Sequence, residues 1–267
     1  MELTLGIMIE TAVYETNSVP RLLDGPAITD PGEFVLNILR EVPADTKTIV
    51  LLRHAKREPF WEIPHHLRGR VEISPEGISM ARKFGESLVR ITPGNRIVLW
   101  HTPANRCRMT AESIRDGCLP GIRARVLDSR PELPHPVEDL EKFRALEQEL
   151  GWEILSRRWL CKGVPGLSDP RAYTCEILKN LLEVPGIGSG DILIVVVHDI
   201  MIIPLLSCIF GKMITEIGFL NGIVLACDGD FITARFSDEG YSLKVERTIP
   251  SDPRIRMVLR SPAESVF

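Results

Sequence analysis

Three apolar runs in the chain each stop abruptly, and a histidine follows within two residues. Short continuous apolar runs of this length predict buried strands. We place the strands at 46–52, 96–100 and 192–197, and they are followed by Arg53-His54, His101-Thr102 and His198-Asp199. A fourth, shorter strand is predicted at 122–127.

Helical periodicity and capping residues predict helices between these strands. Ser74 precedes Pro75 at the start of one amphipathic segment, and Asp169 precedes Pro170 at the start of another, which is the pattern of an N-cap followed by proline in the first turn. The predicted helices lie at 74–90, from Asn105 onward, 137–150, 152–160 and 169–182. A buried helix is expected within 200–209, beginning near Pro204.

The pattern changes near the C-terminus. Segments at 222–227, 231–236 and 241–247 are separated by Asp- and Gly-containing turns, which indicates an antiparallel β-meander. We expect the tail after Pro250 to be irregular. Strands that alternate with helices before the meander predict an α/β fold, a three-layer α/β/α sandwich with a mixed, mostly parallel central sheet. In such sheets ligands bind at the carboxyl ends of the strands, where the three histidines lie.

The predicted domain organisation is simple. Residues 1–45, with a short helix at about 32–40, are interpreted as an N-terminal extension that packs on the domain. Residues 46–267 are interpreted as a single α/β domain with an insertion around 128–170 and the C-terminal β-meander.

Charge and composition narrow the classes of partner. A net charge of −4 and a pI of about 5.9 argue against nucleic acid or an anionic membrane as the main partner. No apolar stretch approaches the roughly 20 residues of a membrane span. The N-terminal residues lack the basic flank and the cleavage site of a signal peptide, and the six cysteines are scattered along the chain. We therefore expect a cytoplasmic protein with reduced thiols.

The residues at the strand ends suit chemistry on a phosphate monoester. Arg53 and Arg57 flank His54, and Arg106 lies near a predicted helix N-terminus, so a cationic cradle for phosphate is expected. Neutral His54 could attack phosphorus as a nucleophile, and His198 could hydrogen-bond a phosphate oxygen during transfer. The leaving alcohol needs a proton from a carboxylic acid, for which Asp199 and Glu132 are both candidates.

Four segments resemble the histidine phosphatase superfamily, and they occur in that family's order across residues 47–210. Arg53-His54-Ala55-Lys56-Arg57-Glu58-Pro59 is similar to the R-H-G-x-R-x-P signature of the acid-phosphatase branch. The other three segments are 73–77, similar to the L-T-x-x-G helix start, 98–112, similar to S-S-P-x-x-R-x-x-Q-T-A-E, and 195–199, similar to the distal histidine motif.

The resemblance implies a phosphoglycerate mutase-like fold, His54 as the nucleophile, and a phosphate pocket of Arg53, Arg57, Arg106 and His198. Ala55 departs from the usual glycine, although Arg-His-Ala-Lys also resembles the small phosphohistidine phosphatases. His198-Asp199 resembles the acid-phosphatase branch, in which the aspartate is the proton donor. Other branches place a glutamate after the third strand, which here corresponds to Glu132 or a neighbour.

These observations favour a metal-independent phosphomonoester hydrolase that acts through a phosphohistidine. No cofactor or metal ion is expected, and the partner is a small phosphorylated substrate or a phosphoprotein. Three alternatives remain open: a mutase-type phosphoryl transferase, a metal-dependent hydrolase that uses His198-Asp199 as ligands, and an inactive phospho-ligand binding protein.

Overall fold

A computed structural model of the 267-residue chain describes residues 7–9, 31–60, 63–118, 125–126, 133–228, 231–236, 239–245 and 255–260. Its centre is a mixed sheet with the strand order β1-β9-β8-β7-β6-β2-β5-β3-β4. The strands of the described residues are β1 (Ile7–Ile9), β2 (Lys47–Arg53), β3 (Arg96–His101), β4 (Arg125–Val126), β5 (Asp191–Val197), β6 (Gly222–Asp228), β7 (Phe231–Phe236), β8 (Glu239–Val245) and β9 (Ile255–Arg260).

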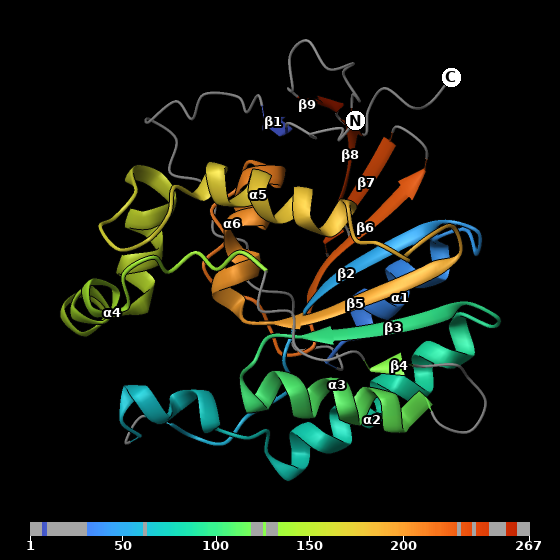
Figure 1. Ribbon diagram of the computed structural model, residues 1–267, viewed down its shortest axis with the longest axis horizontal. Coiled ribbons are helices and arrows are strands. Elements are labelled where there is room, and N and C mark those ends of the chain that lie inside the picture. Colours follow the sequence, from blue (N-terminus) through green and yellow to red (C-terminus); the bar gives the residue numbers. More distant parts are fainter. Residues whose placement is uncertain are drawn as a thin grey trace.

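Helices cover both faces of this sheet, as Figure 1 shows. The three-layer α/β/α sandwich predicted from the sequence is therefore confirmed. The α-helices are α1 (Glu33–Glu41), α2 (Pro75–Ile91), α3 (Asn105–Cys118), α4 (Leu140–Lys162), α5 (Pro170–Leu182) and α6 (Asp199–Phe210), and a 3₁₀ helix, η1, spans His65–Arg70.

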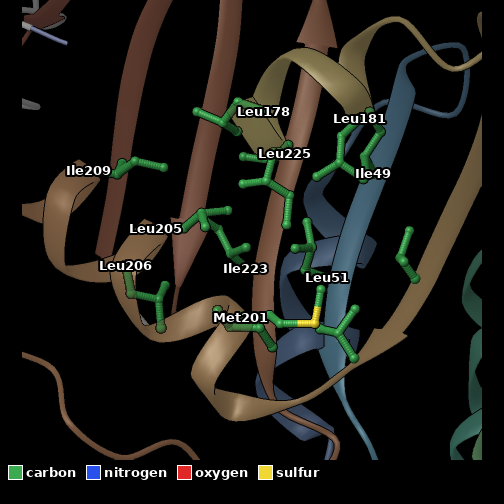
Figure 2. Close-up of a cluster of buried hydrophobic side chains, with 14 of the residues drawn as sticks. Ile49, Leu51, Leu178, Leu181, Met201, Leu205, Leu206, Ile209, Ile223 and Leu225 are labelled. Carbon is green, nitrogen blue, oxygen red and sulfur yellow. The ribbon is translucent and has the colours of Figure 1, made fainter. Parts of the chain in front are cut away.

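The two faces of β2 and β5 enter different apolar cores because successive side chains of a strand point to opposite sides. Ile49, Leu51 and Val195 pack with α5 and α6 in one core, whose centre is drawn in Figure 2. Val50 and Val196 pack with α1, α2 and α3 in the other core. Burial on both faces explains why these strands read as continuous apolar runs.

The register of the parallel strands brings the predicted strand ends together. β2 and β5 run parallel with Arg53 opposite Val197, and β5 and β3 run parallel with His101 opposite Val196. β5 thus lies between β2 and β3, and the chain leaves all three strands at the same edge of the sheet. His54, Thr102 and His198 are the first residues after those ends.

Most elements lie where the sequence places them, with the predicted N-caps. Ser74 Oγ accepts a hydrogen bond from Gly77 N at 3.1 Å, and Asp169 Oδ1 accepts from Ala172 N at 2.9 Å. The helices predicted at 137–150 and 152–160 are joined as α4 across a non-helical residue, Gly151.

Two element predictions are wrong. α6 begins at Asp199 and contains Pro204, whereas the sequence suggested a start near that proline. The tail after Pro250 was expected to be irregular, but it contains β9, which pairs with β8 and β1. The partners of β9 lie elsewhere along the chain, and the periodicity of one segment does not show such pairing.

Candidate active site

His54 follows β2 and is almost completely enclosed. Its backbone amide donates to Val197 O at 3.1 Å, which continues the β2–β5 pairing by one residue, and its relative exposure is 3%. Its Nδ1 lies 2.8 Å from Ala55 O. A carbonyl oxygen can only accept, so Nδ1 carries the ring proton and Nε2 keeps its lone pair. His54 is therefore set in the tautomer whose Nε2 is a nucleophile.

The surroundings of His54 favour its neutral form. Burial lowers the pKa of the imidazole well below 6.5, and the positive charges of Arg106, Arg53 and Arg57 lower it further, against the opposing effect of the Ala55 hydrogen bond. A neutral imidazole is the form that can attack phosphorus.

His198 is the N-cap of α6 and faces His54 edge-on. The two ring centroids are 5.7 Å apart with an interplanar angle of 68°. His198 Nδ1 accepts from Arg106 Nη2 at 3.3 Å, so the ring proton is on Nε2, which lies 3.2 Å from Thr102 Oγ1. Burial, Arg106 and His54 lower the pKa of His198 well below 6.5. A second neutral imidazole thus stands beside the first with an N–H to donate.

Arg106 lies in the first turn of α3 and is tied to two other elements. Its Nη1 donates to Arg68 O of η1 at 2.8 Å, and its Nη2 contacts His198. Its Nε is buried without a hydrogen-bond partner. Burial lowers the pKa of the guanidinium from its usual value. This cation therefore holds a buried donor that a phosphate oxygen could satisfy.

Arg53 is the last residue of β2 and is paired with Asp199. Its Nη2 lies 2.8 Å from Asp199 Oδ2, and its Nη1 donates to Ile217 O. Its Nε is buried without a partner, as in Arg106. The guanidinium carbon lies 4.6 Å from the centre of the Phe219 ring. Asp199 Oδ1 accepts from Ile200 N at 2.9 Å, so both carboxylate oxygens of Asp199 are engaged.

Arg57 lies over the ring of Phe60, with 3.6 Å from the guanidinium carbon to the ring centre. Burial lowers the pKa of Arg57 to about 10, and the charges of Arg106 and Arg53 contribute to the shift. The three arginines therefore influence one another electrostatically. An anion bound among them would relieve this repulsion.

Ala55, which stands where the family signature has glycine, fits its place without strain. Among the described residues other than glycine only Leu220 has a positive φ, so Ala55 has an ordinary backbone conformation. Its amide donates to Thr110 Oγ1 of α3 at 3.0 Å. The alanine is compatible with the conformation that presents His54.

The structure thus brings six of the predicted residues into one neighbourhood: Arg53, His54, Arg57, Arg106, His198 and Asp199. Glu132 lies outside the described residues. Sequence reasoning missed the contacts of Thr102 with His198 and of Phe219 with Arg53. Thr102 could have been found because it follows a predicted strand end, whereas nothing in the sequence pattern singles out Phe219.

Two further observations concern the described residues. None of them form a group of three or more His, Cys, Asp or Glu side chains placed to hold a metal ion. Across the same residues, no helix has the length and apolar character needed to span a membrane.

Comparison with known proteins finds a sequence family that part of the chain matches. The family model of the histidine phosphatase superfamily (branch 1) matches residues 49–150, which confirms the resemblance predicted from the sequence. No curated protein matches the chain.

Solved structures that are similar to this chain share little of its sequence. A phosphoglycerate mutase from Bacillus anthracis str. Sterne is 16% identical, with a TM-score of 0.49 and coverage of 73% of this chain and 95% of its own. A phosphoserine phosphatase from Entamoeba histolytica, solved with 3-phosphoglyceric acid, is 16% identical, with a TM-score of 0.43 and coverage of 67% and 89%. A phosphoglycerate mutase from Plasmodium falciparum is 17% identical, with a TM-score of 0.36 and coverage of 80% and 99%.

Proposed function

Residues 49–150 match the family model of the histidine phosphatase superfamily, and from that premise we propose that the chain hydrolyses phosphate monoesters through a phosphohistidine at His54. The observation that carries the proposal is the tautomer and setting of His54. Its Nδ1 is committed to Ala55 O, its Nε2 is unprotonated, and its charged form is disfavoured by burial and by arginines. These are the properties that a histidine nucleophile needs.

In the proposed reaction, Arg53, Arg57 and Arg106 hold the phosphoryl oxygens. Nε2 of His54 attacks phosphorus, the P–N bond forms, and the bond from phosphorus to the ester oxygen breaks. His198 donates a hydrogen bond from Nε2–H to a phosphoryl oxygen as charge shifts in the transition state, and it keeps its proton throughout. Water then attacks the phosphohistidine, and inorganic phosphate leaves with His54 restored. The chemistry proceeds without a metal ion.

The departing alkoxide takes its proton from a carboxylic acid, and Asp199 and Glu132 remain the two candidates. Asp199 adjoins His198, and its Oδ2 is paired with Arg53. Glu132 has the sequence position that the resemblance assigns to the acid in other branches. The same group would afterwards remove a proton from the attacking water.

The central experiment is a phosphomonoester panel run with and without chelator on wild type and His54→Ala. We expect turnover that survives chelation and falls by at least about 10³-fold in His54→Ala, because the nucleophile is lost. His66→Ala is the matched control, since His66 is an exposed histidine of η1, and its activity should equal that of wild type. Wild-type activity in His54→Ala would refute the proposal.

The same panel assigns the proton donor. Loss of the donor should slow the first-turnover release of the alcohol from alkyl phosphates by about 10²–10⁴-fold but change the first-turnover release of p-nitrophenolate little, since p-nitrophenolate leaves without a proton. Asp199→Asn and Glu132→Gln are compared on both substrates. The variant that discriminates between the substrates identifies the acid, and equal losses on both would argue against that residue.

The proposed substrate is a small phosphorylated molecule or a phosphoprotein, and the proposed location is the cytoplasm. The panel also separates the alternatives. Phosphoryl exchange between two sugar acids faster than hydrolysis would identify a mutase. Loss of activity with chelator would identify a metal-dependent hydrolase, and phosphate binding without turnover would identify a binding protein.

A further inference from the structure

The segment between α6 and β6, which includes residues 217–221, packs against the end of β2. It contains no residue of the family signatures. Leu220 N donates to Arg53 O at 3.1 Å, and Asn221 O accepts from Arg53 N at 2.8 Å. Ile217 O accepts from the Arg53 guanidinium. Both backbone groups of Arg53 and one end of its side chain are therefore held by residues 217–221.

Phe219, in the middle of this segment, contacts two residues of the candidate active site. The Arg53 guanidinium carbon lies 4.6 Å from the centre of its ring. The ring of His54 lies 5.8 Å from it, centroid to centroid, at an interplanar angle of 42°. The phenyl ring is half-buried, so it forms part of the wall of the site and also meets solvent.

The neighbours of Phe219 fix its place. Leu220 is fully buried in the core beneath α1 and α2, and it holds a left-handed backbone conformation with φ of 53°. A non-glycine residue keeps such a conformation only where contacts with its surroundings offset the conformational cost. Two residues after Leu220, Gly222 packs so tightly on β2 that a Cβ would lie 1.8 Å from Leu51 O. Phe219 is thus presented from a rigid support.

We infer that Phe219 is a positioning residue, which holds the guanidinium of Arg53 and the ring of His54 in the arrangement that receives phosphate. The inference rests on the proposed function. Arg53 meets a carboxylate at Nη2, a carbonyl at Nη1 and an aromatic ring near its central carbon. Attraction between the cation and the aromatic face adds orientation without supplying a competing acceptor, so the buried Nε–H of Arg53 stays available to an anion.

The contact makes a prediction about which side chains can replace phenylalanine. Tyrosine keeps the aromatic face, whereas leucine has similar bulk and no π-system. A cation–π contact at a partly buried site corresponds to roughly a 3- to 30-fold effect. We expect Phe219→Leu and Phe219→Ala to lower kcat/KM for p-nitrophenyl phosphate by about that factor, and Phe219→Tyr to retain wild-type kcat/KM within about twofold.

The control is Phe210→Leu, which changes a buried phenylalanine at the end of α6 that packs on Phe236. It should lower the midpoint of thermal unfolding and leave kcat/KM unchanged when each variant is assayed well below its own midpoint. Phe219 variants that keep wild-type kcat/KM would overturn the inference. So would equal losses in Phe219→Leu and Phe219→Tyr, because packing rather than the aromatic face would then be responsible.

The test remains decisive if the proposed function fails. A wild-type protein without turnover on the panel refutes phosphatase activity, and the affinity for inorganic phosphate then decides the inference. Calorimetry should show phosphate binding about 3- to 30-fold weaker in Phe219→Leu than in wild type and nearly unchanged in Phe219→Tyr. Equal affinity in all three proteins would overturn it.

Discussion

The amide of Ala55 depends on a side chain from another element. It donates to Thr110 Oγ1 of α3 at 3.0 Å, and that hydroxyl in turn donates to Arg106 O at 2.6 Å. One hydroxyl therefore joins the residue after His54 to the turn that carries Arg106. Both Ala55 and Thr110 are fully buried, so water cannot replace the hydrogen bond.

Thr110→Val should therefore destabilise the protein by about 1–3 kcal/mol, because it leaves the buried amide of Ala55 without an acceptor. Thr174→Val is the matched control. Thr174 is equally buried and likewise donates to a carbonyl four residues earlier, that of Pro170. Denaturant unfolding of both variants measures the difference, and a loss at Thr110 no larger than that at Thr174 would contradict the role of the Ala55 hydrogen bond.

Single residues also mark how far the sequence predicts the site. His54, Arg53 and Arg106 could be identified because they sit at strand and helix ends within recognisable segments. Phe219 could not, because its contact with Arg53 arises from the path of a loop that follows α6. The Asp199–Arg53 pair was also beyond prediction, since only the folded chain shows which cation a carboxylate meets.

At the scale of elements, α2 meets the active-site segment through a glycine. A Cβ on Gly77 would lie 2.0 Å from Lys56 O, and Ser74 N donates to the same carbonyl at 2.9 Å. The N-terminus of α2 therefore packs directly on the backbone between His54 and Arg57. This close approach explains the requirement for glycine in the first turn of the helix.

Gly77→Ala should lower the free energy of unfolding by about 1–3 kcal/mol and reduce kcat/KM, because α2 or the segment at Lys56 must move. Alanine in place of glycine within a helix would otherwise stabilise it by about 0.5–1 kcal/mol, so the sign of the change is diagnostic. Gly69→Ala is the control, since nothing lies within 4 Å of a Cβ there. An unfolding midpoint for Gly77→Ala at or above that of wild type would disprove the close packing.

The elements that the sequence predicted well are those with local signals. The central strands could be predicted because burial on both faces makes them continuous apolar runs. Helices α2 and α5 could be predicted from their capping residues. α6 was placed too late because a proline usually opens a helix. Pro204 instead lies inside this helix, which is buried from Ile200 to Phe210, and packing on all sides outweighs the hydrogen bond lost at the proline.

At the scale of the whole molecule, two neutral histidines with lowered pKa values link stability to pH. The pKa values of His54 and His198 lie well below 6.5 in the folded protein, mainly through burial. An unfolded chain binds protons at these positions near pH 6.5. Between 6.5 and the lowered pKa values, the unfolded state therefore holds more protons, and stability falls as the pH falls.

The free energy of unfolding should consequently be insensitive to these groups above about pH 7.5 and should decrease below pH 6.5, with a slope of up to about 2.7 kcal/mol per pH unit from two histidines. Urea unfolding across pH 5–8 measures the slope. His54→Gln should reduce it by up to about 1.4 kcal/mol per pH unit, while His66→Gln, at an exposed position, should leave it unchanged. A slope unaffected by His54→Gln would show that this histidine titrates normally in the fold.

The position of β5 between β2 and β3 has a consequence for how the protein is made. During synthesis β2 and β3 leave the ribosome long before residues 191–197, yet neither can pair with the other in the native sheet. Until β5 inserts, two apolar strands each present an unpaired edge, a template for association with other chains. The unfinished chain also lacks His198. If the proposed function holds, activity therefore requires that β5 has been inserted between β2 and β3, and a nascent chain needs protection from aggregation until then.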